Sequence, residues 1–371
     1  MSLKRILGPI LGVGLLLSLP VGTAYAQRWS VFTVPQSPPS GAARASVPRG
    51  LAVGNDGTLY LSESGPYPME ESVPGLVRMR DATGNWSVLA GPGTDLDHVL
   101  SPAGLAFGPW GTLYVADTGM RRVTRRDPDG TWSLMASAGE RPGQVCAPRS
   151  LRFTAADDLL IADWGRVGRL DPRGRWTAEG TFGYGPGQLY AGSAVAMTPD
   201  GSLWVAEVQG MYSNSQNRLQ VRDSSGKWTS VSNVDYTGMA SDAEGNLYLA
   251  APSLNEVWSR DRLGAWTVVA SKGSAAGQVL TPMDVAVDVA GRLNVAEAGN
   301  RRIQRLDPRA SPAPLLGDVD GDGQTTVSDV LSLLRMVVGL SPIGPDALAA
   351  ADLDQDGLIS TRDAVLLLRR L

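Results

Sequence analysis

The chain has 371 residues, of which 43% are hydrophobic, and this composition is enough to build at least one large buried core. Its 33 basic and 37 acidic residues give a formal net charge of −4 at pH 7, so no basic field exists that would attract nucleic acid or an anionic membrane. Cys146 is the only cysteine, which excludes a disulfide within the chain and leaves stability to a packed core or a bound metal.

Residues 1–26 have the pattern of a secretory signal peptide. Lys4 and Arg5 precede an apolar run over residues 6–19, and the sequence Thr-Ala-Tyr-Ala at 23–26 matches an Ala-x-Ala cleavage site. The run is too short for a membrane span, and Gly and Pro interrupt it. We therefore expect a secreted protein without a membrane span, whose mature form begins at Gln27.

Residues 27–308 contain six copies of one repeat. Each copy opens with a Gly-Leu-Ala-like strand, continues with a Leu-Tyr-Val-Ala-Asp-like strand, and recurs at intervals of 44 to 54 residues. The second residues of the six openings are Leu51, Leu105, Leu151, Val195, Met239 and Val285. Short apolar strands that are separated by glycine turns at this period predict the blades of a β-propeller. We therefore expect a mainly β fold with six blades.

The fourth strand of the sixth repeat is missing from its expected place. In the other five repeats this strand begins with a tryptophan after an Asp-x-x-Gly turn, at Trp86, Trp132, Trp176, Trp228 and Trp266. Residues 29–34 (WSVFTV) have the pattern of a fourth strand, but no first, second or third strand precedes them. We expect this segment to complete the sixth blade, which would close the ring and remove an exposed sheet edge.

The best-preserved repeat, residues 102–123, reads Pro-x-Gly-Leu-Ala-x-x-x-x-Gly-x-Leu-Tyr-Val-Ala-Asp-x-Gly-x-x-Arg-Val. Gly-Gln pairs at 143–144, 187–188 and 277–278 precede three of the repeats. This pattern resembles NHL repeats, and the resemblance implies an NHL-type six-bladed propeller. It leaves the function open, because NHL propellers include protein binders, nucleic-acid binders and a few lyases.

One face of the predicted ring carries irregular insertions at residues 64–74 and 208–216. Because neighbouring strands are antiparallel, the starts of first strands, the ends of second strands and the linkers between blades all share this face. Variable loops on a rigid scaffold are common binding sites. The face also collects aromatic residues: Trp164, Tyr184, Tyr190 and Tyr212. We expect these rings either to stack on sugars or anchor a polypeptide, or to fold back over the rim of the core.

Carboxylates end the second strand in five of the six repeats, at Glu63, Asp117, Asp163, Glu207 and Glu297. Such a ring could bind a cation or perform acid and base chemistry near the axis. However, the carboxylates follow the repeat period, which is typical of an architectural feature. We therefore favour pairing with arginines of the same motif, such as Arg122, Arg218 and Arg302, or with linker amides.

His98 is the only histidine, in a loop of the irregular face, where it could act as a base or contact a ligand. A single histidine excludes a multi-histidine metal site. The sequence contains no nucleophile elbow, phosphate loop or dinucleotide fingerprint, so we assign no catalytic residue.

After a Pro/Ala linker at 309–314, residues 315–371 contain two calcium loops, which begin at Asp318 and Asp352. Such a loop supplies oxygen ligands from positions 1, 3, 5, 7, 9 and 12, with a glycine at position 6 for the sharp turn. The predicted ligands are Asp318, Asp320, Asp322, Gln324, Thr326 and Asp329 in the first loop, and Asp352, Asp354, Asp356, Leu358, Ser360 and Asp363 in the second. We therefore expect two calcium ions.

An apolar, helix-forming segment follows each loop, at residues 330–340 and 364–371. This duplicated loop–helix pattern resembles a type I dockerin over residues 315–371. The resemblance implies calcium-dependent docking onto a cohesin module of a scaffold or cell-surface protein. It also implies that positions 10 and 11 of each loop read the partner, namely Val327, Ser328, Thr361 and Arg362. The two pairs differ chemically, which argues against a symmetric, two-way docking mode.

Together these features predict a secreted, non-catalytic and monomeric binding protein. Its propeller would bind a glycan or a protein, and its dockerin-like domain would tether it to a cohesin-bearing partner, in keeping with extracellular polysaccharide degradation. Two alternatives stay open: a lyase or hydrolase that acts on a polysaccharide or lactone through the carboxylate ring, and a structural adhesin.

Overall fold

A computed structural model describes residues 28–35, 47–65, 75–207, 217–307, 316–319, 325–340, 350–354, 356 and 358–371. Contacts divide the chain into two compact units, one that includes Trp29–Leu306 and one that includes Asp307–Leu371. The predicted signal peptide and the 309–314 linker lie outside the described residues. No helix in the described part of the chain has the length and apolar character needed to cross a membrane.

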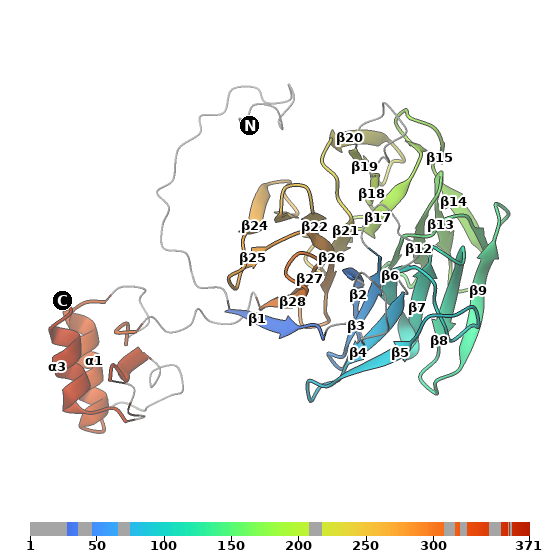
Figure 1. Ribbon diagram of the computed structural model, residues 1–371. Helices are drawn as coiled ribbons and strands as arrows, with labels where there is room; N and C mark the ends of the chain where they lie inside the picture. The colour runs from blue at the N-terminus through green and yellow to red at the C-terminus, as the bar shows by residue number, and fades with distance from the viewer. Residues whose placement is uncertain are drawn as a thin grey trace, which may run out of the picture. The chain divides into compact units, whose positions relative to one another are not determined.

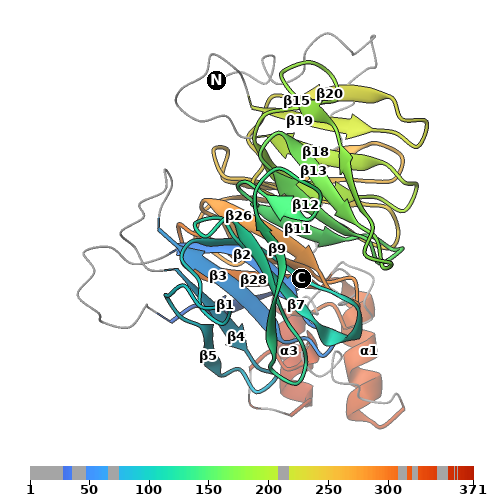
Figure 2. The same ribbon diagram turned by 90° about the vertical axis from the view of Figure 1, so that its right-hand side faces the viewer.

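The first unit is a six-bladed β-propeller, which confirms the predicted fold (Figures 1 and 2). Blade 1 consists of β2 (Val47–Val53), β3 (Leu59–Ser64), β4 (Leu76–Arg80) and β5 (Trp86–Ala90). Blade 2 consists of β6 (Pro102–Phe107), β7 (Leu113–Asp117), β8 (Arg122–Arg126) and β9 (Trp132–Ala138). Blade 3 consists of β11 (Ser150–Phe153), β12 (Leu159–Asp163), β13 (Arg166–Leu170) and β14 (Trp176–Glu179).

Blade 4 consists of β17 (Gly192–Met197), β18 (Leu203–Glu207), β19 (Arg218–Arg222) and β20 (Trp228–Ser232). Blade 5 consists of β21 (Gly238–Ser241), β22 (Leu247–Ala251), β23 (Glu256–Arg260) and β24 (Trp266–Lys272). Blade 6 consists of β26 (Pro282–Val287), β27 (Leu293–Glu297), β28 (Arg302–Asp307) and β1 (Arg28–Thr33). The linkers add short parallel pairs, in which β10 (Gln144–Val145) joins β9, β15 (Thr181–Phe182) joins β16 (Gln188–Leu189), and β25 (Gln278–Val279) joins β24.

The ring is closed by β1, which pairs with β28 at the outer edge of blade 6 (Figure 1). Val34, just after β1, is 3% exposed and packs in the cluster between blades 6 and 1, together with Leu51 and Ile303. The ring of Phe32 lies under two guanidinium groups, with its centroid 4.5 Å from Arg80 Cζ in blade 1 and 5.2 Å from Arg305 Cζ in blade 6. The first strand of the chain is therefore part of the interface that joins the last blade to the first.

The core lies between neighbouring blades. For example, Leu105 and Val115 of blade 2 pack against Ala52 and Val77 of blade 1, and all four are buried. The first strands also approach one another so closely that a Cβ atom on Gly50 would collide with the carbonyl oxygen of Ala103 in the next blade. A glycine is therefore required at position 50 by packing around the axis.

In the described part of the second unit, α1 (Val327–Val337) and α3 (Thr361–Leu368) pack against each other. Val330 and Leu333 of α1 and Leu367 of α3 belong to its buried core. Both helices begin three residues earlier than the apolar segments predicted them to begin.

Capping explains the earlier start. Thr326 and Asp329 form a capping box at α1, and Ser360 and Asp363 form the same box at α3. In each box, the side chain of the third helical residue accepts a hydrogen bond from the backbone amide of the N-cap residue. The aspartate at position 12 of each predicted calcium loop is therefore inside the first turn of a helix.

Candidate functional site

The five carboxylates that end the second strands are all buried and paired with arginine. The contacts are Arg78 Nε to Glu63 Oε2 at 2.5 Å, Arg122 Nε to Asp117 Oδ2 at 3.7 Å, Arg166 Nε to Asp163 Oδ2 at 3.5 Å, Arg218 Nε to Glu207 Oε2 at 2.7 Å, and Arg302 Nε to Glu297 Oε1 at 2.8 Å. Burial raises the pKa of Glu63 and of Asp117 above the ordinary range. The carboxylates are held apart in separate blades and none of them lines the axial cavity described below.

These pairs hold the linkers between blades. Arg302 also donates to the carbonyl oxygens of Ser274 at 2.6 Å and Gln278 at 2.8 Å. Glu297 accepts a hydrogen bond from the amide of Leu280 at 3.0 Å. The arrangement agrees with the architectural interpretation for Asp117, Asp163, Glu207 and Glu297, which accept hydrogen bonds from linker amides. Glu63 differs, because only its Oε2 atom meets an arginine and its buried Oε1 atom has no hydrogen-bond partner among the described residues.

Four aromatic rings gather at the third and fourth blades, around Tyr190. Its ring centroid lies 4.8 Å from that of Trp164, 5.3 Å from that of Tyr184 and 5.5 Å from that of Phe182. Tyr184 and Tyr190 are stacked, whereas the other two pairs are tilted. Trp164 is 42%, Phe182 58% and Tyr184 53% exposed, so the cluster presents an apolar surface to solvent. We call these four residues the aromatic cluster.

The loop that carries the aromatic cluster is anchored by polar contacts. Arg218 donates to the carbonyl oxygens of Tyr184 and Gln188, and Gln188 Oε1 accepts from the Tyr184 amide at 3.1 Å. The Tyr190 amide donates to Glu207 at 2.6 Å. Glu207 and Arg218, which form the carboxylate–arginine pair of blade 4, therefore also anchor the loop that carries the rings. Of the predicted ligand-binding residues, Trp164, Tyr184 and Tyr190 come together, and Tyr212 lies outside the described residues.

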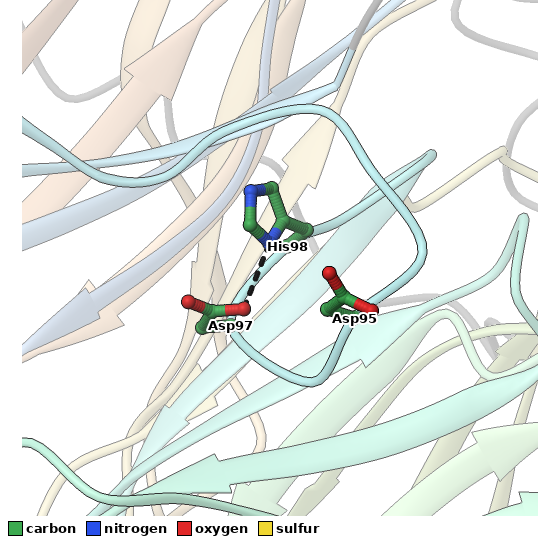
Figure 3. A group of neighbouring side chains, drawn as sticks. All are labelled: Asp95, Asp97 and His98. Atoms are coloured by element: carbon green, nitrogen blue, oxygen red, sulfur yellow. Dashed lines mark hydrogen bonds and ion pairs between the residues drawn. The ribbon is translucent and has the colours of Figure 1, made fainter.

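His98 lies on a separate loop with Asp95 and Asp97 (Figure 3). Its Nδ1 atom is 2.8 Å from Asp97 Oδ1, and its side chain is 40% exposed. Arg122 fixes the loop by donating to the carbonyl oxygens of Asp95 and His98. His98 is not among the described residues that line the axial cavity.

A cavity of about 590 Å³ opens at the axis on the linker face of the ring. The starts of first strands and the ends of second strands line it. Its described charged residues are Arg49, Arg149, Asp235 and Asp284, and no histidine or cysteine is among its described lining residues. Asp235 accepts a hydrogen bond from the hydroxyl of Ser253, and burial raises the pKa of Asp235.

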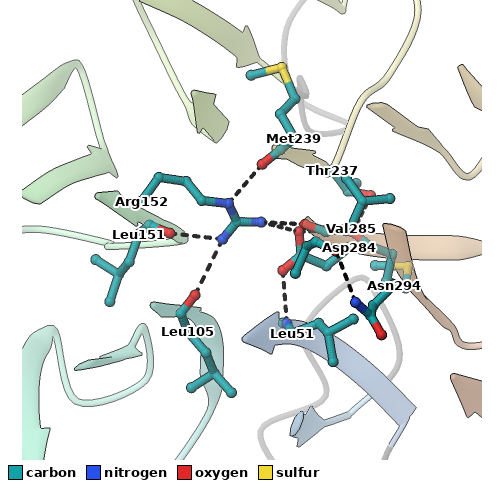
Figure 4. A network of polar contacts seen from close by, with 12 residues as sticks. Leu51, Leu105, Leu151, Arg152, Thr237, Met239, Asp284, Val285 and Asn294 are labelled. Carbon is teal, nitrogen blue, oxygen red and sulfur yellow. Dashed lines mark hydrogen bonds and ion pairs between the residues drawn. The ribbon is translucent and has the colours of Figure 1, made fainter. Parts of the chain in front are cut away.

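Below the cavity, Arg152 crosses the axis (Figure 4). Its Nη2 atom lies 2.6 Å from Asp284 Oδ1, and its Nε atom donates to the Met239 carbonyl at 2.7 Å. Nη1 donates to the carbonyl oxygens of Leu151 at 2.8 Å and Leu105 at 3.3 Å. Nη2 also donates to the Val285 carbonyl, and the Leu51 amide donates to Asp284. These bonds extend the network to blades 1 and 6. The inner strands of five blades therefore meet at one ion pair.

The sequence analysis missed Phe182, Arg49, Arg149, Asp235 and the Arg152–Asp284 pair. A signal for the pair exists, because both residues depart from the repeat. Arg152 takes the place of the alanine in Gly-Leu-Ala, and Asp284 takes the place of the glycine.

The C-terminal unit brings together part of the predicted calcium ligand set. Oxygen atoms of Asp352, Asp354 and Asp356 lie within 4.8 Å of one another, a spacing and chemistry that fit a calcium ion. Asp329 accepts a hydrogen bond from the Val319 amide at 2.7 Å, and its counterpart Asp363 accepts from the Leu353 amide at 2.8 Å. Asp320, Asp322 and Gln324 lie outside the described residues.

The four predicted partner-reading residues lie in the first turns of the two helices. Val327 and Ser328 on α1 and Thr361 and Arg362 on α3 are all exposed. Arg362 Nε is 3.1 Å from Asp354 Oδ2 in the second loop.

Comparison with known proteins agrees with this division. Residues 316–371 match the family model of the dockerin type I domain. A search of curated proteins found no match to the chain. Among solved structures, the chain is similar to a gluconolactonase from Xanthomonas campestris, with a TM-score of 0.53 and 17% identity over 75% of this chain and 97% of that chain. It is also similar to a virginiamycin B lyase from Staphylococcus aureus, with a TM-score of 0.51 and 14% identity over 76% of this chain and 86% of that chain.

Identities of this size show the fold alone, so the names of the two enzymes assign no activity to the propeller. Dockerin domains generally bind calcium, and their presence indicates anchoring through a cohesin. Residues 316–371 are a dockerin type I domain, and the described residues before it form a six-bladed β-propeller that is similar in fold to those two solved structures.

Proposed function

We propose that this protein is a secreted, non-catalytic glycan-binding protein that is tethered to a cohesin-bearing scaffold or surface protein. The aromatic cluster carries the glycan-binding part of the proposal. Three of its rings are substantially exposed, although large aromatic side chains are normally buried. Their loop is anchored, so little conformational freedom would be lost on binding.

The geometry of the exposed aromatic cluster suits the binding of a sugar. The rings of Trp164 and Phe182 are inclined by 53° and 50° to that of Tyr190. Their flat faces can stack on the apolar C–H faces of pyranose rings, while the tyrosine hydroxyls can hydrogen-bond to sugar hydroxyls. Trp164 and Tyr184 both contact Tyr190, so the cluster offers more than one ring, which supports contact with more than one sugar unit.

The dockerin supports the tethering part. Two ions would be held by the two sets of loop residues, and each ion would supply the positive charge that lets carboxylates such as Asp352, Asp354 and Asp356 converge. Val327, Ser328, Thr361 and Arg362 would then contact the cohesin from the first turns of α1 and α3.

A glycan array probed with the full chain tests the proposal. We expect binding to a defined set of polysaccharides and at least a tenfold loss in the variants Trp164→Ala and Tyr184→Ala, because truncating an interface anchor costs about 2 kcal/mol or more. Trp110→Ala is the matched control, since Trp110 is 91% exposed in η2 (Pro109–Gly111), a turn between first and second strands.

The outcomes separate the alternatives. Binding that survives both aromatic substitutions would overturn the assignment of the cluster. Release of products from a bound glycan would identify an enzyme, and binding of proteins but no glycans would identify an adhesin.

A further inference from the structure

The loop that carries Asp95, Asp97 and His98 brings three groups that can bind a metal ion to one place (Figure 3). One ligand atom from each side chain, two carboxylate oxygens and one ring nitrogen, lie within 4.8 Å of one another. His98 Nδ1 is 2.8 Å from Asp97 Oδ1, close to the roughly 3 Å that separates neighbouring ligands when each lies about 2.0–2.1 Å from a shared ion. The same distance fits a hydrogen bond between the two side chains, so the surroundings of the cluster decide between these interpretations.

The backbone of this loop is held in the same way as the backbone of other linkers. Arg122 donates three hydrogen bonds to carbonyl oxygens of the loop, at residues 94, 95 and 98. Arg302 of blade 6 makes the same three bonds at residues 274, 275 and 278, and Arg218 of blade 4 makes them at residues 184, 185 and 188. Positions 95, 97 and 98 therefore correspond to positions 275, 277 and 278 and to positions 185, 187 and 188.

The side chains of the loop depart from those of the other linkers. His98 stands where three linkers have a glutamine, namely Gln144, Gln188 and Gln278, and Asp97 stands where they have a glycine, namely Gly143, Gly187 and Gly277. In those linkers the glutamine Oε1 atom accepts a hydrogen bond from a loop amide, as from Ala275 to Gln278 at 3.2 Å. His98 instead has its Nδ1 atom beside Asp97. A group that holds the loop together has thus been replaced by groups that bind a cation.

A buried hydroxyl on the third strand of blade 2 gives a second observation. At the matching strand position, Gln220 of blade 4 and Gln304 of blade 6 each accept from the amide of the linker glycine and donate to the carbonyl oxygen of the linker glutamine. Blade 2 has Thr124 there, which is fully buried, and its Oγ1 atom has no hydrogen-bond partner among the described residues. An unsatisfied buried hydroxyl is costly, so Thr124 indicates a further polar ligand, such as metal-bound water, at this linker.

We propose that Asp95, Asp97 and His98 bind a divalent transition-metal ion of the zinc class. An imidazole nitrogen combined with carboxylate oxygens suits such an ion, whereas calcium takes oxygen ligands. Three protein ligands leave a coordination position open for water or for an atom of a bound ligand. Arg122 already fixes the loop, so little ordering is needed when the ion binds. The site belongs to the linker of blade 2 and does not depend on the aromatic cluster.

Titration calorimetry of the full chain with zinc chloride tests this inference. The protein carries no added histidine tag, and calcium is present at a concentration that saturates the dockerin. We expect His98→Gln to weaken zinc binding at this site at least about tenfold, because a ligand is lost. The variant should fold, since glutamine occupies the matching position of three other linkers. Asp129→Asn is the matched control, because it removes an exposed carboxylate from a turn of the same blade.

The histidine ring gives an independent readout. His98 is the only histidine, so its ring C–H signals in proton NMR are identified without further assignment. Zinc should shift these signals in the wild type and in Asp129→Asn, and should shift them only at much higher concentration in Asp95→Ala. Should His98→Gln fail to fold, Asp95→Ala also serves for calorimetry, because Ala275 stands at the matching position of blade 6. Ring signals that zinc leaves unchanged in the wild type, or an unaltered zinc affinity in a folded variant of His98 or Asp95, would overturn the site.

Discussion

The guanidinium of Arg152 and the carboxylate of Asp284 meet at 2.6 Å on the axis of the propeller, although they come from blades 3 and 6. Both side chains are largely buried. Asp284 also accepts a hydrogen bond from the inner strand of blade 1, and Arg152 donates hydrogen bonds to the inner strands of blades 2 and 5. In a low-dielectric interior such a pair is costly to break, because the remaining charge is left without a partner.

Arg152→Met should therefore destabilise the propeller by about 3–5 kcal/mol. Adding Asp284→Asn removes the orphaned charge, so the double variant should lose less stability than the sum of the two single variants. Denaturant unfolding of the four proteins measures this coupling. Strict additivity would mean that the pair contributes nothing as a pair.

The closing strand offers a second test. Val34→Asp would place an unpaired carboxylate at the interface between blades 6 and 1, where Val34 is 3% exposed, and should cost about 3 kcal/mol or more. Val31→Asp, in the same segment but 43% exposed, should change stability by less than about 0.5 kcal/mol. Similar melting temperatures for the two variants would refute closure through this strand.

Packing around the axis predicts a glycine effect. Gly50→Ala should lower stability by more than about 2 kcal/mol, because the added methyl group meets the backbone of Ala103, which cannot move without displacing blade 2. Gly91→Ala is the control, since no atom lies within 4 Å of its Cβ position. Thermal unfolding by circular dichroism compares them, and an unperturbed Gly50→Ala melt would contradict the close approach.

The raised pKa of Asp235 predicts a pH effect. Burial disfavours the ionised carboxylate in the folded state, so its pKa is higher folded than unfolded. The wild type should therefore gain stability relative to Asp235→Asn as the pH falls from 7 through the folded pKa, and the gain should be complete below the unfolded pKa. Melting temperatures of both proteins between pH 7 and pH 4 measure this gain. A gain that shrinks or reverses as the pH falls would show that burial does not control the pKa of Asp235.

Calcium removal should unfold the dockerin domain alone. With chelator, the clustered carboxylates repel one another and two short helices are too short to persist, so helical ellipticity should fall while the propeller melt stays unchanged. Asp318→Ala together with Asp352→Ala should abolish both the calcium-induced gain in helicity and cohesin binding. A double variant that still gains helicity with calcium would contradict the ligand assignment.

The repeat made the architecture predictable, because every blade must bury the same faces and the same Gly-Leu-Ala and Leu-Tyr-Val-Ala-Asp patterns recur. The aromatic cluster was partly predictable. Because neighbouring strands are antiparallel, the strand end that carries Trp164 and the linker that carries Tyr184 and Tyr190 lie on one face of the ring. Phe182 was not, because its place beside Tyr190 depends on the linker pairing of β15 with β16.

The axial features could not be derived from periodicity, because they depend on which residues break it. Arg152 and Asp284 lie far apart in sequence, and only the closed ring brings them together. The helix starts were also missed, because the apolar pattern ignores the capping boxes that extend each helix back to position 10 of the loop.

The pairing of β1 with β28 has a consequence for synthesis. When β1 leaves the ribosome, its partner strand and most of the ring have not yet been translated, so the first strand waits unpaired while five blades are made. Contacts of such long sequence separation form slowly. We therefore expect the pairing of β1 with β28 to be the last step of folding. A chain interrupted before Arg302 would leave two open sheet edges available for aggregation.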